Sequence, residues 1–162
     1  MTHPIHPMLV HFPIALLFVS VLFDLIFFYT GREEFKKGGF WLLILGWVAG
    51  LAATLSGTWS EDIVEKAGVP KAAIELHETF AFSTLALFAG LMLVRFWIRN
   101  RWSSRDRLLY AGMAMIGLAL LATTGFWGGD LVYRYGAGVQ PNALNAPAVI
   151  SAPSVENGKT GG

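Results

Sequence analysis

Four long stretches of apolar residues, separated by short polar segments, dominate the pattern of the chain. They cover about residues 8–29, 39–59, 77–98 and 108–129. Because a bilayer core about 30 Å thick is crossed by roughly 20 apolar helical residues, each stretch is long enough to be a transmembrane helix. A buried core helix of a soluble protein could explain one such stretch but not four. The pattern predicts an all-α protein built as a four-helix transmembrane bundle.

Composition supports the membrane class and excludes several others. Residues of the AVILMFWYC set make up 54% of the 162 residues and charged residues 14%, whereas soluble domains carry roughly 25% charged residues. The net charge of +1 gives no field that would attract nucleic acid. The absence of cysteine excludes disulfides, thiolate zinc sites, iron–sulfur ligation and covalent c-type haem. We expect the lipid bilayer, and no nucleic acid, as a partner.

Basic residues in the short loops predict the orientation of the bundle. Cytoplasmic loops of membrane proteins carry an excess of Lys and Arg. The loops after the first and third apolar stretches hold eight such residues, against four on the opposite side. We therefore expect these loops to face the cytoplasm and both termini to lie outside, in the periplasm, with the protein in a bacterial inner membrane. The eight residues are Arg32, Lys36, Lys37, Arg95, Arg99, Arg101, Arg105 and Arg107.

The domain organisation follows from the same pattern. Residues 1–139 are predicted to form one membrane domain. The first apolar stretch is too long for the core of a signal peptide and no Lys or Arg precedes it, so we expect it to be retained. Residues 140–162 are rich in Pro, Ala, Asn, Ser and Gly and show no apolar period, which is typical of a disordered tail.

Two features inside the apolar stretches predict contacts between helices. Gly46, Gly50, Ala53 and Gly57 follow one another at steps of 4, 3 and 4 residues, so they share one helix face. Such small residues mark close helix packing in membranes, and the same face could instead lie against a flat ligand. Asp24 lies near the cytoplasmic end of the first stretch, where we expect it to pair with Arg32 or with a residue of the Arg-rich loop.

All four histidines are predicted to lie at the outer face of the membrane. His3, His6 and His11 lie at or just inside the start of the first apolar stretch, and His77 opens the third. The prolines that follow His3 and His6 disfavour helical dihedral angles, so we expect these two residues in an extended leading segment. His11 is then about one turn inside the bilayer, at a depth comparable with that of His77.

Two membrane histidines at matched depth on different helices suit one planar cofactor between them. A b-type haem needs two axial nitrogen ligands and an apolar slot, and neutral imidazole is a good ligand. We therefore predict one haem b near the outer face. His77 is one ligand, and the other is His11 by depth, or His6 if the leading segment folds inward. The residues assigned to this site are His11, His77, His6, Gly46, Gly50 and Gly57.

Other interpretations of the histidines stay open. A zinc or copper site could combine His6, His11 and His77 with Glu78 or Asp130. Alternatively, the imidazoles simply lie in the headgroup layer, bonded to backbone or water. Metal ligands seldom show such irregular spacing, so haem ranks above zinc or copper.

The histidine count also limits what the protein can do. No histidine lies in the cytoplasmic half of any stretch, so one haem is the most that histidine ligands of this chain can hold. It could exchange electrons with a quinol or with other membrane or periplasmic redox proteins, but it could not carry electrons across the membrane. We predict an electron-transfer subunit without independent catalysis. The alternatives are a cofactor-free accessory or structural subunit of a larger membrane complex, and an outer-face metal-binding protein.

Two motifs at the ends of the domain resemble a known bacterial family. Residues 6–17 have the sequence HPMLVHFPIALL and residues 128–139 the sequence GGDLVYRYGAGV. Together with Asp24 and His77, they resemble the predicted membrane proteins called domain of unknown function 2231, over about residues 6–139. The resemblance implies a four-helix membrane domain working beside redox modules such as Rieske-type proteins, which favours haem. This chain has Tyr135 where many members have His, which weakens the zinc or copper interpretation.

The predicted orientation can be tested in intact cells. A tag or protease site placed at Lys36 is expected to be protected from outside, because the Arg-rich loops face the cytoplasm. A site placed at Lys159 is expected to be accessible from outside. A protected Lys159 site would place the tail in the cytoplasm and would remove every histidine from the outer face.

Overall fold

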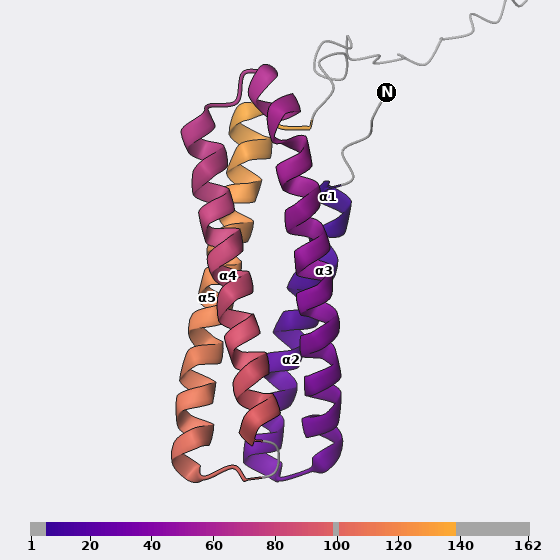
Figure 1. The fold of residues 1–162 in the computed structure, drawn as a ribbon, viewed down its shortest axis with the longest axis vertical. Coiled ribbons are helices and arrows are strands. Elements are labelled where there is room, and N and C mark those ends of the chain that lie inside the picture. The colour runs from indigo at the N-terminus through magenta and orange to yellow at the C-terminus, as the bar shows by residue number, and fades with distance from the viewer. Residues whose placement is uncertain (1–5, 99–100, 139–162) are drawn as a thin grey trace, which may run out of the picture.

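The computed structural model of the protein describes residues 6–98 and 101–138, all within helices or short turns. The helices run side by side along one long axis, with alternating directions (Figure 1). Four segments are long and apolar enough to cross a membrane, α1 and α2 counting as one, and the described residues contain no strand. The predicted all-α bundle is confirmed. The helices are α1 (His6–Leu9), α2 (His11–Thr30), α3 (Glu33–Lys66), α4 (Lys71–Ile98) and α5 (Ser104–Tyr135).

The helices extend further than the apolar stretches. Residues 60–66 continue α3 instead of forming a loop, and α5 runs on through residues 128–135. His6 begins the short helix α1, so the predicted extended conformation at His6 is wrong. The longer ends of α3 and α5 have a physical reason. Charged residues such as Glu and Lys are good helix formers, so hydropathy marks the part of a helix that crosses the lipid and not the ends of the helix. His3 and the predicted disordered tail, residues 140–162, lie outside the described residues.

Local sequence signals end the helices where the chain must turn. Gly31 follows α2 with φ 71°, and its N–H donates to the carbonyl of Phe27 at 2.8 Å. Before α5, Ser103 and Asp106 form a capping box, each side chain accepting a hydrogen bond from the backbone N–H of the other. Only glycine adopts the left-handed region at little cost, and a capping box satisfies two free N–H groups. These signals permit the tight antiparallel connections.

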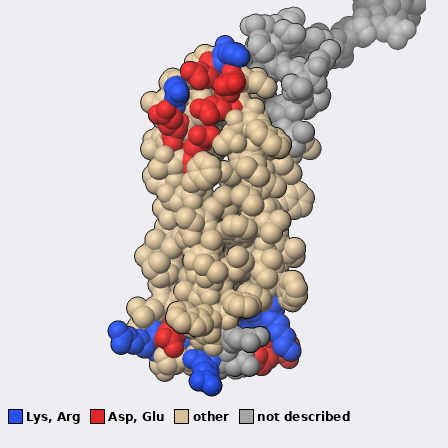
Figure 2. Space-filling view, in the orientation of Figure 1, with Lys and Arg blue, Asp and Glu red and all other residues tan. Residues whose placement is uncertain are grey.

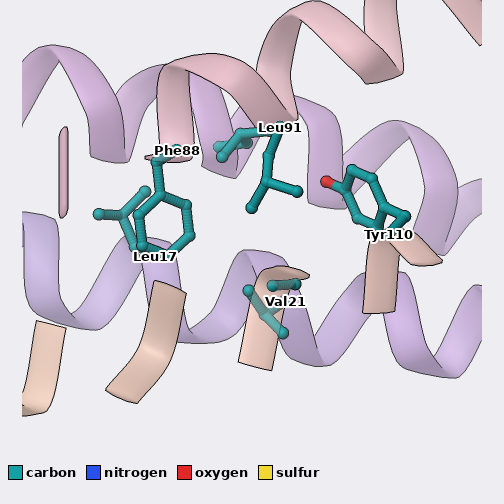
Figure 3. Packing of buried hydrophobic residues seen from close by; sticks show 7 residues of the cluster. Leu17, Val21, Phe88, Leu91 and Tyr110 are labelled. Carbon is teal, nitrogen blue, oxygen red and sulfur yellow. The ribbon is translucent and has the colours of Figure 1, made fainter. Parts of the chain in front are cut away.

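The bundle is assembled from two helix pairs. The most extensive packing joins α2 to α3 and α4 to α5, and contacts of α3 with α4 and of α2 with α5 close the four-helix arrangement. The largest fully buried side chain is Phe88, which packs near Leu17 in the middle of the bundle (Figure 3). The core cluster consists of Leu17, Val21, Leu43, Phe88, Leu91, Tyr110 and Ala114.

Charged side chains gather at the two ends of the bundle, with a broad uncharged band between them (Figure 2). Many large apolar residues of this band point outward, as expected for a surface in contact with lipid. We call the end with the α3–α4 turn the acidic end and the opposite one the basic end. Described acidic residues at the acidic end are Glu61, Asp62, Glu65, Glu75, Glu78 and Asp130. Described basic residues at the basic end are Arg32, Lys36, Lys37, Arg95, Arg101, Arg105 and Arg107.

A buried polar network near the basic end joins the four long helices. The carboxylate of Asp24 on α2 accepts hydrogen bonds from the guanidinium of Arg95 on α4 and, at 2.9 Å, from the hydroxyl of Tyr110 on α5. Arg95 also donates to the backbone carbonyl of Lys36 on α3. Asp24 is 2% exposed and Arg95 6%. The expectation that a residue counted with the Arg-rich loop would pair with Asp24 is confirmed, with Arg95 as the partner.

Close approach of α2 and α3 supports this network. Ser20 donates a hydrogen bond to the carbonyl of Gly39 at 2.8 Å. A Cβ atom at Gly39 would lie 2.5 Å from the Asp24 carboxylate oxygen, so only glycine fits there. The missing side chain lets the carboxylate lie between the helices, where Arg95 reaches it.

Replacing Arg95 by Leu leaves the Asp24 carboxylate buried without its cation. We expect the free energy of unfolding to fall by about 3–5 kcal/mol, the cost of breaking a buried pair from one side. Thermal unfolding in detergent measures this loss. The double replacement of Arg95 and Asp24 by Leu should be more stable than Arg95→Leu alone. The exposed Arg101→Leu is the control, and equal stability of the two single variants would contradict the structural role.

Candidate functional site

Two histidines lie beside each other near the acidic end. His6 is the first residue of α1, and His77 lies in the second turn of α4. Their ring centroids are 6.2 Å apart and their ring planes are nearly perpendicular, at 83°. The short helix α1 packs on α3, which brings His6 inward. The structure therefore brings His6 next to His77, which is the second of the two pairings that the sequence left open.

Each ring is held by a hydrogen bond to a backbone carbonyl. Nδ1 of His6 lies 2.8 Å from the carbonyl oxygen of Ala53, and Nδ1 of His77 lies 3.1 Å from that of Thr124. Because a carbonyl can only accept, Nδ1 carries the proton and Nε2 of each neutral ring keeps its lone pair. Among the described residues neither Nε2 has a hydrogen-bond partner. This is the usual arrangement of a metal-ligating histidine, whose second nitrogen donates to the protein.

A glycine makes room for each of the two rings. A Cβ atom at Gly57 would lie 3.1 Å from Cε1 of His6, and one at Gly128 would lie 3.0 Å from Cε1 of His77. Gly57 was assigned to the site from the sequence. Gly128 was not assigned to the site; it falls in the fourth apolar stretch predicted from the sequence, residues 108–129, and lies within α5. The two contacts fix how deeply each imidazole enters the bundle.

A cavity of about 350 Å³ opens beside the histidines and reaches the core at Leu17. This volume lies in the range of small-molecule and cofactor sites, about 300–1,000 Å³. Its walls come from all five helices and are mainly apolar or small residues, with a few polar side chains such as Glu78 and Thr84. A smaller cavity of about 110 Å³ shares His6 and His77 and extends toward the acidic end. The histidine rings thus border both cavities.

The other residues predicted for the site take different positions. Gly50 lines the larger cavity, as Gly57 does. Gly46 instead packs directly on Leu17, because a Cβ atom at Gly46 would lie 2.9 Å from the Leu17 side chain. Gly46 therefore serves helix packing. His11 borders the cavity as well but is exposed on α2.

The alternative zinc or copper site is not assembled among the described residues. Within residues 6–98 and 101–138, no group of three or more His, Asp or Glu side chains lies close enough to hold a metal ion. His11 is exposed on α2 and does not join the pair, and Asp130 instead lies 3.7 Å from Arg134. Within the described part of the chain, the site thus offers two imidazole nitrogens and no third protein ligand of this kind.

Comparison with known proteins identifies the family. Residues 2–141 match the sequence model of a family described as predicted membrane protein, DUF2231. The chain belongs to this family. Searches of curated proteins and of solved structures find no match. The family description states membrane character and no activity, so the function of this DUF2231 protein must be argued from its site.

The two end motifs of this DUF2231 protein meet at the histidine pair. Residues 6–17 supply His6, and residues 128–139 supply Gly128, which contacts His77. Both motifs line the larger cavity. Tyr135 borders neither cavity. The motifs therefore describe one site, although more than 100 residues separate them in the chain.

Enlarging Gly128 should disturb this site directly. In Gly128→Val the new side chain collides with the His77 ring and weakens its bond to Thr124, so we expect a loss of about 1–3 kcal/mol in unfolding free energy. Gly112→Val is a matched control on α5, since nothing lies within 4 Å of a Cβ there. Thermal unfolding in detergent compares the two. Equal stability of both variants would contradict tight packing of His77 on α5.

Proposed function

We propose that this protein binds one b-type haem between His6 and His77 and acts as an electron-transfer subunit of a bacterial inner membrane. The observation that carries the proposal is the pair of imidazoles, 6.2 Å apart, each held through Nδ1 by a backbone carbonyl. In this state each ring can offer Nε2 to iron, and the carbonyl bond raises the basicity of the ligating nitrogen.

The spacing of the two rings supports coordination of one metal ion between them. Metal–imidazole bonds are about 2.0–2.1 Å long, so two imidazoles on opposite sides of one metal have centroids roughly 6 Å apart. The observed distance of 6.2 Å agrees with this value. Perpendicular ring planes are compatible with binding from opposite faces of a macrocycle.

The walls of the cavity suit a flat apolar group. Gly50, Gly57 and Gly128 present no side chain toward it, and two alanines, three leucines and other apolar residues such as Ile14 and Val132 contribute to the remaining lining. A haem in this position supplies one-electron redox chemistry. The protein's own contribution is to hold both imidazoles as neutral Nδ1–H tautomers.

The location of the pair suggests the partners. Both histidines lie near the acidic end, and that end carries fewer basic residues than the opposite one, so the positive-inside rule directs it outward. A haem there could exchange electrons with a quinol in the outer leaflet or with a periplasmic redox protein. No second histidine site among the described residues would extend the path to the basic end.

One observation favours a second function, a cofactor-free accessory subunit of a larger membrane complex. Gly90 on α4 and Gly112 on α5 are exposed, and nothing lies within 4 Å of a Cβ at either position. Small residues on lipid-facing surfaces permit close contact with another helix. This function needs no ligand at the histidines.

Spectroscopy of the purified protein distinguishes the two functions. Wild-type protein extracted in mild detergent should show a Soret band and split reduced α and β bands of a low-spin haem with two histidine ligands. His6→Ala and His77→Ala should each abolish the low-spin spectrum, because each removes one axial nitrogen. His11→Ala is the matched control, since it changes a cavity-lining histidine that lies outside the pair, and it should keep the spectrum.

Two results would overturn the haem proposal. One is a colourless, well-folded wild-type protein after expression with added haem, which would leave the accessory subunit. The other is a low-spin spectrum that survives in both His6→Ala and His77→Ala, which would place any haem elsewhere.

A further inference from the structure

The larger cavity beside the histidine pair is open on one side of the bundle. Four of its lining residues are exposed, namely His11 and Ile14 on α2 and Gly125 and Tyr133 on α5. By contrast, the residues that α3 and α4 contribute to the lining are buried or half-buried. The two helices with exposed lining residues, α2 and α5, are neighbours in the bundle. The cavity therefore opens between them, and we call this opening the lateral mouth.

The seam between α2 and α5 is closed toward one end and bare toward the other. Toward the basic end, Tyr110 on α5 donates a hydrogen bond to Asp24 on α2, and its ring centroid lies 5.9 Å from that of Phe28. Toward the acidic end, α5 lines the cavity with glycines. Nothing lies within 4 Å of a Cβ atom at Gly125, and a Cβ atom at Gly129 would meet only a ring atom of its own helix, at 3.9 Å. At these positions no side chain of α5 fills the lateral mouth.

The surface around the lateral mouth is apolar. Ile14, at the edge of the mouth, is 40% exposed, and Phe18, one turn further along α2, is 55% exposed. Phe126, next to Gly125 on α5, is 67% exposed. Large apolar side chains on the outside of a membrane-spanning helix lie against lipid. The mouth therefore faces the bilayer and not the aqueous phase.

A second approach to the histidines runs through the smaller cavity, and this approach is acidic. The smaller cavity extends toward the acidic end and is lined by Glu61 and Glu78. Glu78 borders both cavities, whereas Glu61 borders the smaller one alone. A haem carries propionate groups, which are anionic at neutral pH, so these carboxylates repel it. The volume of about 110 Å³ is also below the usual range of cofactor sites. Size and charge both favour the lateral mouth.

We propose that haem enters and leaves this site from the membrane, through the lateral mouth between α2 and α5. The inference rests on the proposed function and adds the route and the source of the cofactor. A largely apolar macrocycle prefers lipid to water. Its propionates favour the headgroup layer, where exposed tyrosines such as Tyr133 are typical. The glycines of α5 leave the mouth unobstructed for a flat group.

A covalent plug in the lateral mouth tests the route. The chain has no cysteine, so Gly125→Cys provides a single thiol at the mouth. The full-length variant is purified in detergent, loaded with haem, reacted with pyrene maleimide and reconstituted in phosphatidylcholine vesicles. Transfer of haem to excess apomyoglobin is then followed by absorbance. We expect the modification to slow this transfer about tenfold or more, equivalent to a barrier about 1.4 kcal/mol higher.

Gly112→Cys is the matched control. Gly112 also lies on α5 with nothing within 4 Å of a Cβ atom, but it does not line the cavity. Its modification should leave the rate of haem transfer unchanged. The attached pyrene also reports on its surroundings. In modified Gly125→Cys, lipids that carry a nitroxide should quench the pyrene fluorescence more strongly than aqueous iodide does, because the mouth faces lipid.

The outcomes separate the route from the proposed function. Equal rates of transfer from modified and unmodified Gly125→Cys would overturn the lateral route and leave haem binding intact. Stronger quenching by iodide than by nitroxide lipids would also overturn it, because the mouth would then face water. A wild-type protein that binds no haem would overturn the proposed function, and this inference with it. If the modification expels haem from Gly125→Cys, Ile14→Cys at the α2 edge of the mouth serves in its place under the same criteria.

Discussion

The bundle depends on satisfying polar groups away from water. Asp24, Arg95 and Tyr110 would each be expensive in a bilayer alone, but together they form one network that also takes in a backbone carbonyl of α3. Because apolar surfaces gain little from contact with each other in lipid, such directional bonds and close packing decide which helices lie together. Gly39 permits this arrangement, since any side chain there would occupy the position of the carboxylate.

The same constraint operates at the other end with a different result. The Nδ1 atoms of His6 and His77 are satisfied by carbonyls, whereas neither Nε2 has a hydrogen-bond partner among the described residues, and both histidines border a cavity. A polar network that is fully satisfied near the basic end contrasts with one that stays half-satisfied near the acidic end. This difference is the physical basis for assigning a structural role to the first and for proposing a ligand at the second.

Much of the fold and part of the site could be predicted from the sequence. The histidines could be grouped at one end because they all fall near the same ends of apolar stretches. The choice between His6 and His11 as the partner of His77 could not be predicted, because it depends on how α1 folds against α3. Gly128 was not assigned to the site, because the sequence alone does not show which helix face of the fourth apolar stretch meets His77. Its helical spacing from Gly125 and Val132, which line the same cavity, was the available signal.

By itself the sequence determined the number of membrane helices, the class of protein and the family resemblance, because hydropathy and helix length depend only on neighbours along the chain. It also indicated that Asp24 needs a cationic partner. Only the tertiary structure decided that Arg95 is that partner and that His6 meets His77. Each of these depends on the rotation and crossing of helices, which are set by packing between residues far apart in the sequence.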